Sequence, residues 1–361
     1  MEVSAVFDEL TIESHAGPYS VIFNDAVPTD PAVLPAGEPH FLIDANVARL
    51  YARELQFAVN HRNAIIIEAT EQSKSLLRTI PVFEKLISNS IRRDHVLVAI
   101  GGGIIQDIAC FVASTLLRGL PWVFVPTTLL AQADSCIGSK SSINLGDVKN
   151  VLGTFKPPVK IFVYRAFLET LDPKDIHSGV GEIIKVHAIA GVPAFDGLAR
   201  DFDRVFSDRS VLLKYVGAAL RIKRPFIEKD EFDRGIRNVL NYGHSFGHAI
   251  ESATHYAVPH GIAVTIGMDM ANYVAVKRGE LPIEHYDRMH GILCKNYAAY
   301  ARTNIPAAAL FSALTKDKKN TSSSLRLVLP KGATATIEPI LVAFDATFRS
   351  QCERFLEKMS G

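Results

Sequence analysis

The chain has 361 residues, enough for one large domain or two ordinary ones, and its hydrophobic fraction of 48% is that of a globular protein. Thirty-nine basic residues nearly balance 38 acidic ones, so bulk charge gives no reason to expect nucleic acid or a membrane surface as a partner. We therefore expect neither partner, and an anionic ligand has to bind where basic residues cluster locally.

The first half of the sequence alternates short apolar runs with helical patterns. Strands are predicted at 41–43, 64–67, 95–100 and 122–125, and helices at 72–88 and 105–117. The last two strands are almost wholly apolar, as in strands buried on both faces of a parallel sheet. Alternation of this kind predicts a parallel sheet with right-handed crossovers.

Helical patterns dominate after about residue 172. They lie at 176–190, 210–230, 234–253 and 260–277, and one strand-like run remains at 325–329. We predict an α/β domain over residues 1–170 and a mostly helical domain over 171–361, and a cleft between two such domains is the usual place for a ligand.

Two features bear on location. The four cysteines are widely and irregularly spaced with no Cys-x-x-Cys pair, which suits reduced thiols rather than a disulfide framework or a thiolate zinc site. The first ten residues lack the apolar core of a signal peptide, and two uncharged runs at 119–133 and 252–268 are too short and proline-broken to span a bilayer. A cytoplasmic protein is expected.

A glycine run follows the third predicted strand. Gly101-Gly102-Gly103 leads into a helical pattern, where glycines let the backbone approach a phosphate and the helix start offers free N–H groups. The run is not the G-x-G-x-x-G fingerprint, and a tight turn is the alternative. Asp107 could serve a ribose hydroxyl, and Thr127 and Thr128 add hydroxyls at the carboxyl end of the next strand, where α/β sheets bind ligands.

A polar stripe occupies the predicted helix 234–253. Arg237, Asn241, His244 and His248 recur at spacings that place them on one helical face. Such residues on a partly buried face need partners, supplied either by a polar network of the protein or by a ligand.

A divalent metal suits two of these histidines and their sequence neighbours. His260 follows a proline at the start of another predicted helix and offers an imidazole like that of His244. Glu182, within the predicted helix 176–190, offers a carboxylate. Two histidines and one glutamate with an open position are a catalytic zinc pattern.

Several basic residues are candidates for holding an anion. Lys140 and Lys149 stand out because they lie in or just after a Ser- and Gly-rich loop at 135–142. Each basic residue alone is an ordinary surface charge, but several in one cleft would bind a polyanion. The full set is Arg118, Lys140, Lys149, Lys185, Lys223, Arg237, Lys318 and Lys319.

Taken together, these motifs resemble 3-dehydroquinate synthase and, more broadly, the sugar phosphate cyclases. They follow family order from about Asp44 to Leu329. The matching blocks include Gly101-Gly102-Gly103-x-x-x-Asp107, Pro126-Thr127-Thr128, Lys149-Asn150-x-x-Gly153, Ser178-Gly179-x-x-Glu182-x-x-Lys185, Arg237-x-x-Leu240-Asn241-x-Gly243-His244-Ser245-Phe246-Gly247-His248 and His260-Gly261.

The resemblance implies an NAD-binding α/β domain, a helical metal-binding domain and a homodimer. The implied metal ligands are Glu182, His244 and His260, with zinc expected and cobalt as the alternative ion. The implied NAD contacts are Asp44, Glu71, Lys74, Gly102, Gly103, Asp107, Thr127, Thr128, Lys140, Lys149 and Thr170.

The resemblance also implies a pocket for a small anionic sugar phosphate. Its catalytic residues are Lys185, His248, Lys140, Arg237 and Asn241. Its further substrate contacts are Asp134, Asn150, Lys223, one of Lys318 and Lys319, and Arg118, which in this family comes from the neighbouring subunit.

The implied reaction belongs to the shikimate pathway. NAD is reduced and regenerated within one turnover, phosphate is eliminated, and an intramolecular aldol step closes a carbocycle. The positions of Lys223, Arg237, Asn241 and His248 match the acid-substrate enzymes, which favours 3-deoxy-arabino-heptulosonate 7-phosphate as substrate.

Departures from the family pattern keep alternatives open. Gly138-Ser139-Lys140-Ser141 replaces the usual Gly-Gly-Lys-Thr, and Gln106 and Cys110 replace common glycines. A secondary-metabolic cyclase (aminodehydroquinate, 2-deoxy-scyllo-inosose or valiolone-type) is the alternative within the family. A metal-dependent glycerol dehydrogenase and a non-catalytic ligand-binding relative are the alternatives outside this reaction.

Overall fold

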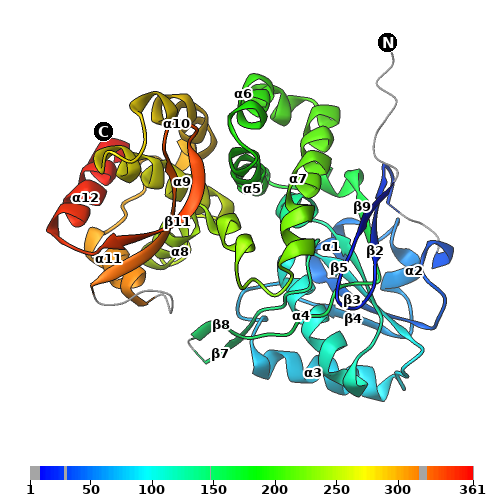
Figure 1. Cartoon of the computed structure of the whole chain (residues 1–361). Coiled ribbons are helices and arrows are strands. Elements are labelled where there is room, and N and C mark those ends of the chain that lie inside the picture. Colours follow the sequence, from blue (N-terminus) through cyan, green and yellow to red (C-terminus); the bar gives the residue numbers. More distant parts are fainter. Residues whose placement is uncertain (1–8, 28–30, 147, 317–322, 361) are drawn as a thin grey trace, which may run out of the picture. The chain divides into compact units, whose positions relative to one another are not determined.

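The computed structural model describes residues 9–27, 31–146, 148–316 and 323–360 (Figure 1). The chain divides into two compact units. The first comprises residues 1–172 and 224–232, and the second comprises residues 173–223 and 233–361.

The first unit is built on a seven-stranded sheet in the order β1-β2-β9-β6-β5-β3-β4. Only β1 and β2 pair antiparallel, and the other neighbours are parallel. The strands are β1 Glu9–Ile12, β2 Tyr19–Asn24, β3 Pro39–Asp44, β4 Ala64–Ile67, β5 Val96–Gly101, β6 Trp122–Pro126 and β9 Lys160–Tyr164. The predicted α/β class with a parallel sheet is therefore confirmed.

Short helices and a hairpin complete the first unit. The helices are α1 Ala45–Leu50, α2 Gln56–Val59, α3 Leu76–Ser88 and α4 Gly103–Thr115, with short turns η1 Pro31–Val33, η2 Leu116–Arg118, η3 Ala131–Ser135 and η4 Arg165–Thr170. The hairpin pairs β7 Ile143–Leu145 with β8 Val148–Leu152.

Every residue of β5 is buried because both faces of the sheet are covered. Alternate residues such as Val98 and Ile100 join a core with α1, α2 and η4, including Tyr51 and Phe167. The helix α4 contacts β5 and β6 and buries Ile105 and Ile108.

The sheet changes direction beside the glycine run. From β3, the chain moves to β4 on one side and then to β5 on the other side of β3. In open parallel sheets, ligands bind at the carboxyl ends of strands at such a switch point. The loop from β5 into α4 begins there.

The second unit is mostly helical, and this part of the predicted fold class is also confirmed. Its helices are α5 Pro173–Ile189, α6 Val192–Ser207, α7 Arg209–Lys229, α8 His244–Ala253, α9 His260–Lys277, α10 Ile283–Tyr297, α11 Ala307–Lys316 and α12 Ala346–Ser360, with turns η5 Ile236–Asn241 and η6 Ala298–Tyr300. The last turns of α7 belong to the first unit. The strands β10 Ser324–Lys331 and β11 Thr336–Ala343 form an antiparallel pair.

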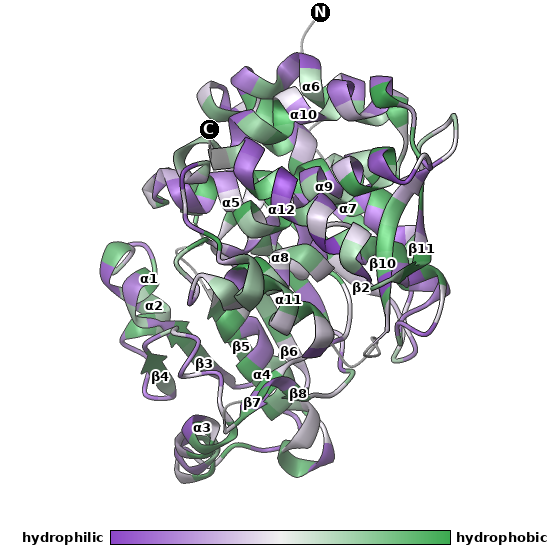
Figure 2. Ribbon diagram, turned by 90° about the vertical axis from the view of Figure 1, so that its left-hand side faces the viewer, coloured by the Kyte–Doolittle hydropathy of each residue, from purple (hydrophilic) through white to green (hydrophobic). Residues whose placement is uncertain are grey.

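The helix α9 is the core element of the second unit. Fourteen of its side chains or glycines are buried, and it contacts α5, α8, α10, α12 and β10. The peripheral helix α6 instead buries one face only, which leaves hydrophilic and hydrophobic colours on opposite sides of its ribbon (Figure 2).

Two predicted helices differ from the observed ones. The helix predicted over 72–88 begins at Leu76, because the Ser75 hydroxyl accepts a hydrogen bond from the Arg78 N–H and caps it. The helix predicted over 234–253 is wrong. It is the 3-10 turn η5 followed by α8, separated at Gly243, which has a left-handed φ of 77°.

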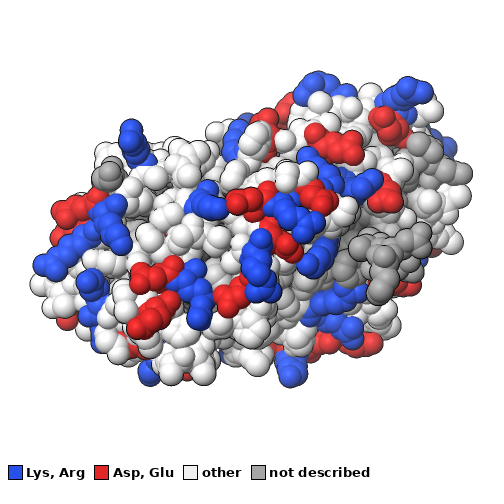
Figure 3. Space-filling model, turned by 90° about the horizontal axis from the view of Figure 1, so that it is seen from above, with Lys and Arg blue, Asp and Glu red and all other residues white. Residues whose placement is uncertain are grey.

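The surface carries interspersed charge. On the face shown in Figure 3, basic and acidic side chains alternate over short distances. Ion pairs on α6 and its neighbours are examples: Arg204 lies 3.2 Å from Asp201, and Lys214 lies 3.1 Å from the same residue. Among the described residues, no helix is both long and apolar enough to cross a membrane.

Candidate active site

Glycines bring three helices of the second unit into backbone contact. A Cβ atom on Gly261 of α9 would clash with the Ser178 carbonyl of α5, and one on Gly181 of α5 would clash with the Gly261 carbonyl. On α8, a Cβ on Gly247 would lie 3.0 Å from the Cα of Val264. The three helices carrying Glu182, His244 and His260 are therefore held at distances that no larger residue allows.

Two imidazoles converge on one buried carboxylate. Glu182 Oε1 lies 3.4 Å from His260 Nε2 and 3.8 Å from His244 Nε2. Its other oxygen, Oε2, lies 2.5 Å from the ammonium of Lys185, one turn later on α5. Glu182 and Lys185 are 1% and 2% exposed, so their charges lie outside bulk water.

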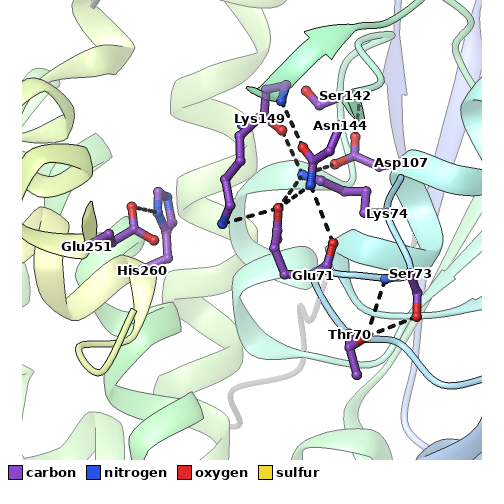
Figure 4. A network of polar contacts seen from close by, with 11 residues as sticks. Thr70, Glu71, Ser73, Lys74, Asp107, Ser142, Asn144, Lys149, Glu251 and His260 are labelled. Carbon is purple, nitrogen blue, oxygen red and sulfur yellow. Dashed lines mark hydrogen bonds and ion pairs between the residues drawn. The ribbon is translucent and has the colours of Figure 1, made fainter. Parts of the chain in front are cut away.

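The second nitrogen of each histidine is engaged elsewhere. His260 Nδ1 lies 3.1 Å from Glu251 Oε2, as Figure 4 shows. His244 Nδ1 lies 3.3 Å from the Tyr242 carbonyl. Partners of this kind fix the tautomer of a metal-binding histidine and aim its free nitrogen at the ion, here Nε2 in both cases.

The charges of this cluster shift its pKa values in opposite directions. Burial alone would raise the pKa of Glu182, but Lys185 and His244 hold it well below its usual range. Burial and the charge of Lys185 hold the pKa of His244 well below normal. Burial opposes protonation of His260, but the nearby carboxylates of Glu182 and Glu251 raise its pKa to about 10.

The residues present suit a divalent ion. Glu182 Oε1 is buried and accepts no hydrogen bond of normal geometry, although two imidazole nitrogens face it. Leaving a buried carboxylate oxygen unsatisfied is costly, and an ion held by all three groups would remove that cost. Because His260 would have to release a proton, metal affinity should fall in acid.

A fourth side chain offers an alternative ligand. Nitrogens of His244, His248 and His260 lie within 4.8 Å of one another. His248 is exposed, whereas Glu182 is buried and carries the negative charge that offsets a divalent cation. We therefore favour Glu182 as the third ligand, which leaves His248 at the rim of the cluster.

The remaining predicted pocket residues of the second unit have mixed surroundings. Lys223 and Arg237 are 6% and 8% exposed, unusual for long cationic side chains. Asn241, the last residue of η5, donates a hydrogen bond to the Asn238 carbonyl at 3.2 Å. Because the helix is broken at Gly243, the predicted single face joining Arg237 and Asn241 to His244 is wrong, whereas His244 and His248 are one turn apart on α8.

In the first unit, the glycine run starts a helix. Gly102 is the N-cap of α4 and Gly103 its first residue, so free backbone N–H groups lie at the carboxyl end of β5. A Cβ on Gly102 would lie 2.9 Å from the Thr128 side chain, which leaves room only for hydrogen. Thr127 is buried, and its N–H donates to the Gly101 carbonyl.

A polar network lies beside this helix (Figure 4). The buried Lys74 ammonium donates to Asp107 Oδ2 at 3.1 Å and to Asn150 Oδ1 at 2.8 Å. The other oxygen of Asp107 accepts from the Ser142 N–H at 2.8 Å. Burial raises the pKa of Asp107 to about 6, although Lys74 acts to lower it.

The network continues to the β7–β8 hairpin. Glu71 Oε1 accepts from the Asn144 amide at 2.8 Å and lies 3.4 Å from the Lys149 ammonium. The Asn150 N–H donates to Asn144 Oδ1, and Asn150 has a left-handed φ of 53°. The structure thus brings together five of the sequence-predicted residues: Glu71, Lys74, Asp107, Lys149 and Asn150.

Two predicted cofactor residues have local structural partners. Asp44 caps α1 by accepting a hydrogen bond from the Asn46 N–H, and burial raises its pKa. The Thr170 hydroxyl lies 3.0 Å from the Tyr51 hydroxyl, at the end of η4. Both residues still lie at or beyond the carboxyl ends of strands β3 and β9.

The other predicted substrate residues that the structure describes belong to the first unit. Arg118 is exposed, and both it and Leu117 have left-handed backbone, with φ values of 65° and 52°. Such strain persists where the surroundings enforce it, often at functional sites. Lys140 pairs in a β-bridge with Phe155, and Asp134 lies in η3. Lys318 and Lys319 lie outside the described residues.

Sequence reasoning missed three partners of these sites. Glu251 lies two helical turns after His244, a spacing that could have revealed it as a partner of the same helix face. Asn144 stands in a short block, Ile143-Asn144, that matches the family pattern, but that match indicated no role for it. Gln106, noted only as a departure, joins Ser135 by two contacts of 2.6 Å.

The comparisons with known proteins begin with the fold. A 2-deoxy-scyllo-inosose synthase complexed with carbaglucose-6-phosphate, NAD+ and Co2+ has a TM-score of 0.81 at 20% identity, over 97% of this chain and 99% of that one. A 2-epi-5-epi-valiolone synthase from Streptomyces hygroscopicus subsp. jinggangensis 5008, with NAD+ and Zn2+ bound, has a TM-score of 0.79 at 24% identity, over 100% of this chain and 99% of that one. The chain therefore shares its fold with these two synthases.

Sequence similarity identifies the protein family more narrowly than the fold does. The 3-dehydroquinate synthase N-terminal family matches residues 64–178, and the 3-dehydroquinate synthase C-terminal family matches residues 179–320. The 3-dehydroquinate synthase of Streptococcus pyogenes serotype M3 is 35% identical over 295 residues, which cover 80% of this chain and 82% of that protein. The chain belongs to the 3-dehydroquinate synthase family.

Proposed function

We propose that this protein converts 3-deoxy-arabino-heptulosonate 7-phosphate into 3-dehydroquinate and phosphate. The observation that carries the proposal is the convergence of His244 and His260 on the buried Glu182, beside the ammonium of Lys185. Membership of the 3-dehydroquinate synthase family supports the same reaction. The protein would thus be a carbon–oxygen lyase that forms a carbocycle.

The two units have different main tasks in this proposal, although several substrate contacts come from the first unit. We assign NAD binding to residues 1–170 and metal and substrate binding to residues 171–361. Glu182, His244 and His260 would hold the divalent ion, expected to be zinc, with cobalt as the alternative. When bound, NAD supplies a reversible hydride acceptor and the divalent ion supplies Lewis-acid polarisation of an oxygen.

The NAD contacts proposed from the family pattern include the start of α4. The N–H groups of Gly102 and Gly103 suit a pyrophosphate, because a helix N-terminus favours anions. Polar side chains of the first unit would hold the rest of the cofactor. They are Asp44, Glu71, Lys74, Asp107, Thr127, Thr128, Lys140, Lys149 and Thr170.

Cationic side chains would hold the two anionic ends of the substrate. Arg237 and Lys223 are buried, and a desolvated carboxylate needs cations of that kind. Arg118, Lys140, Asn150 and one of Lys318 and Lys319 are proposed to bind the phosphate.

Polar groups near the metal cluster would act on the reacting atoms. Lys185 holds a fixed positive charge within 2.5 Å of Glu182, which suits stabilisation of a developing oxyanion. The exposed imidazole of His248 can donate or accept a proton at the rim of this cluster. From the family pattern, Asn241 of the second unit and Asp134 of the first are proposed to orient substrate hydroxyls. The phosphate of the substrate can itself take up the proton lost beside the ketone.

Phosphate release tests the proposal directly. The protein, loaded with zinc and NAD, would be incubated with a panel of sugar phosphates, and the ring product would be identified by NMR. Phosphate and 3-dehydroquinate should form in equal amounts, with NAD required and no NADH accumulating. Stoichiometric NADH formation from a simple polyol would instead identify a glycerol dehydrogenase type of enzyme.

A secondary-metabolic cyclase is the second candidate. Ser139 and Ser141 replace the usual glycine and threonine around Lys140, and the Ser141 hydroxyl lies 2.8 Å from that of Thr154. Gln106, in place of glycine, is bonded to Ser135. If sedoheptulose 7-phosphate, which lacks a carboxylate, is the preferred substrate, a valiolone-type cyclase replaces 3-dehydroquinate synthase as the proposed function.

The homodimer is part of the proposal, because Arg118 would act on the neighbouring subunit's substrate. Arg118→Ala and His260→Ala should each be inactive. When the two are mixed and allowed to exchange subunits, each heterodimer regains one complete site, so about a quarter of wild-type activity should return. Absence of any recovery, with subunit exchange verified by mass spectrometry of the mixture, would place Arg118 in its own subunit's site.

A further inference from the structure

A second cluster of potential metal ligands lies in the second unit, apart from the Glu182 cluster. Asp269 comes from the middle of α9, and His290 and Cys294 come from α10. The two α10 residues are four positions apart and so lie on one helical face. Asp269 is completely buried, whereas His290 and Cys294 are partly exposed.

The distances within this cluster are short. His290 Nδ1 lies 2.9 Å from Asp269 Oδ2 and 3.4 Å from Cys294 Sγ, and Sγ lies 3.9 Å from Oδ2. A tetrahedral zinc ion with bonds of about 2.0–2.3 Å separates its N, O and S ligands by roughly 3.3–3.6 Å. Shifts of about half an ångström would therefore bring these atoms to ligand positions.

A cavity opens onto two of these side chains, His290 and Cys294. It has a volume of about 290 Å³, and its lining includes His290, Cys294, Tyr297, Phe355 and Lys358. It can admit an ion and leave room for water or another molecule as the fourth ligand. Ligand set, spacing and access thus coincide at one place.

The chemistry of the cluster favours a particular class of ion. A thiolate, an imidazole and a carboxylate suit borderline-soft divalent ions such as Zn2+ or Co2+ rather than Mg2+ or Ca2+. The two anionic ligands would neutralise the charge of the cation, which is needed beside the buried Asp269.

Two tyrosine hydroxyls contact the proposed ligand atoms. The Tyr297 hydroxyl donates to Asp269 Oδ2 at 2.6 Å and lies 3.0 Å from Cys294 Sγ. The Tyr286 hydroxyl lies 3.1 Å from His290 Nδ1. A bound ion would replace these hydroxyls at the ligand atoms.

We propose that Asp269, His290 and Cys294 form a second metal site, which binds Zn2+ or Co2+ and ties α9 to α10. The cysteine spacing argued against a thiolate zinc site, whereas this proposed site uses one thiolate with a histidine and an aspartate that the fold brings beside it. Because α9 begins at His260, the second ion would stabilise the helix that carries one of the first site's proposed ligands.

Cobalt substitution tests the site, because thiolate-bound Co2+ has a near-ultraviolet sulfur-to-metal charge-transfer absorption. The proposed first site contains no sulfur ligand. Apo wild-type protein titrated with Co2+ should bind two ions per chain and develop the sulfur absorption. His260→Ala should keep that absorption and lose one ion, whereas Cys294→Ser should lose the absorption and the other ion while keeping its phosphate-releasing activity.

Control variants separate site loss from damage to the fold. Cys352→Ala removes a buried thiol of the same unit and should leave the absorption unchanged. In a His260→Ala background, added Zn2+ should raise the Tm, and a further Cys294→Ser change should abolish that rise. His290→Gln, checked for folding by circular dichroism, should also abolish the absorption.

The contrary results are equally clear. A wild-type protein saturated at one Co2+ per chain without sulfur absorption would overturn the proposal. The cluster would then be a hydrogen-bonded network of the core and nothing more. Sulfur absorption that survives Cys294→Ser would also overturn it.

Discussion

The glycine-loop region of the first unit and the histidine cluster of the second differ in how completely their polar groups pair. In the first unit, Lys74 joins Asp107 and Asn150, and the free oxygen of Asp107 accepts from the backbone of Ser142. In the second unit, Glu182 Oε1 is buried without a normal hydrogen bond while two imidazole nitrogens face it. We call the first a closed network, because its charged groups bond to one another. We call the second an open cluster, because its central carboxylate oxygen lacks a normal hydrogen bond.

The difference shows what each region needs from its ligand. A closed network keeps its shape without a ligand and offers a preformed surface. A bound nucleotide would therefore add contacts without satisfying a buried polar group that had lacked a partner. An open cluster carries an unsatisfied buried charge until an ion arrives. We therefore expect metal binding to change the stability of the protein more than NAD binding does.

The largest predicted effect is removal of a metal ligand. His260→Ala and Glu182→Gln should each lose the ion and lower kcat by about a thousandfold, because the ion contributes several kcal/mol of transition-state stabilisation. Metal content by mass spectrometry and phosphate release measure the two effects. NAD affinity should stay within about twofold of wild type, because the closed network is unchanged. Full metal occupancy in His260→Ala would contradict the assignment of His260 as a metal ligand.

Arg237→Lys should have the next largest effect. The lysine keeps the charge but loses the planar fork that binds a carboxylate through two hydrogen bonds. A loss of about 2–4 kcal/mol in transition-state stabilisation is expected, which is roughly 30- to 1,000-fold in kcat/KM. The loss should be large for 3-deoxy-arabino-heptulosonate 7-phosphate and small for sedoheptulose 7-phosphate. Equal losses with both substrates would show that Arg237 does not bind the carboxylate.

Glu251→Gln should have an intermediate effect on the open cluster. Glutamine keeps the size of the side chain but removes the charge behind His260, and such changes weaken metal binding by about 10- to 100-fold. A competition titration with a chelator measures the affinity. Glu228→Gln is a matched control, since Glu228 contacts the Glu13 backbone instead, and it should leave metal affinity unchanged.

Asp107→Asn should have the smallest effect on ligand affinity, and on NAD alone. The Lys74 ammonium would lose the nearer of its two charged partners, so we expect NAD to bind about tenfold more weakly, as for a lost hydrogen bond to a charged group. Calorimetric titration with NAD measures this, with metal content as the control. Loss of metal in this variant would contradict the separation of the two regions.

The same variant gives a pH test. The pKa of Asp107 is raised from 3.8 to about 6 in the folded protein, so between these pH values the folded state binds more protons than the unfolded state. Its contribution to stability is therefore present below about pH 4 and lost as pH rises through 6. Relative to wild type, Asp107→Asn should gain on the order of 1–3 kcal/mol between pH 4 and 7, measured by urea unfolding.

The sequence predicted best what depends on local pattern. The strand at 64–67 and the helix at 260–277 match β4 and α9 residue for residue. The strand β9 was missed although Ile161–Tyr164 is an apolar run, and β11 was missed because most of its residues are at least partly exposed.

The sequence pattern gave wrong or incomplete predictions where backbone conformation or tertiary contacts determine the structure. Only the fold shows that Gly243 turns left-handed between η5 and α8, which separates Arg237 from the face of His244. The sequence suggested Glu182, His244 and His260 as a set from their residue types, and the family resemblance implied the same set. Their distances, and the bond from His260 to Glu251, depend on the packing of three helices and could not be read from spacing.

The close packing of α5, α8 and α9 limits how this enzyme can be altered. Gly181, Gly261 and Gly247 admit no side chain, so a mutant library that includes them would consist largely of misfolded members. Diversification for new substrates should keep these glycines fixed and vary positions such as Gln106, Ser139 and Ser141. In natural relatives under the same constraint, we expect the packing of these three helices to stay unchanged while residues at such variable positions differ.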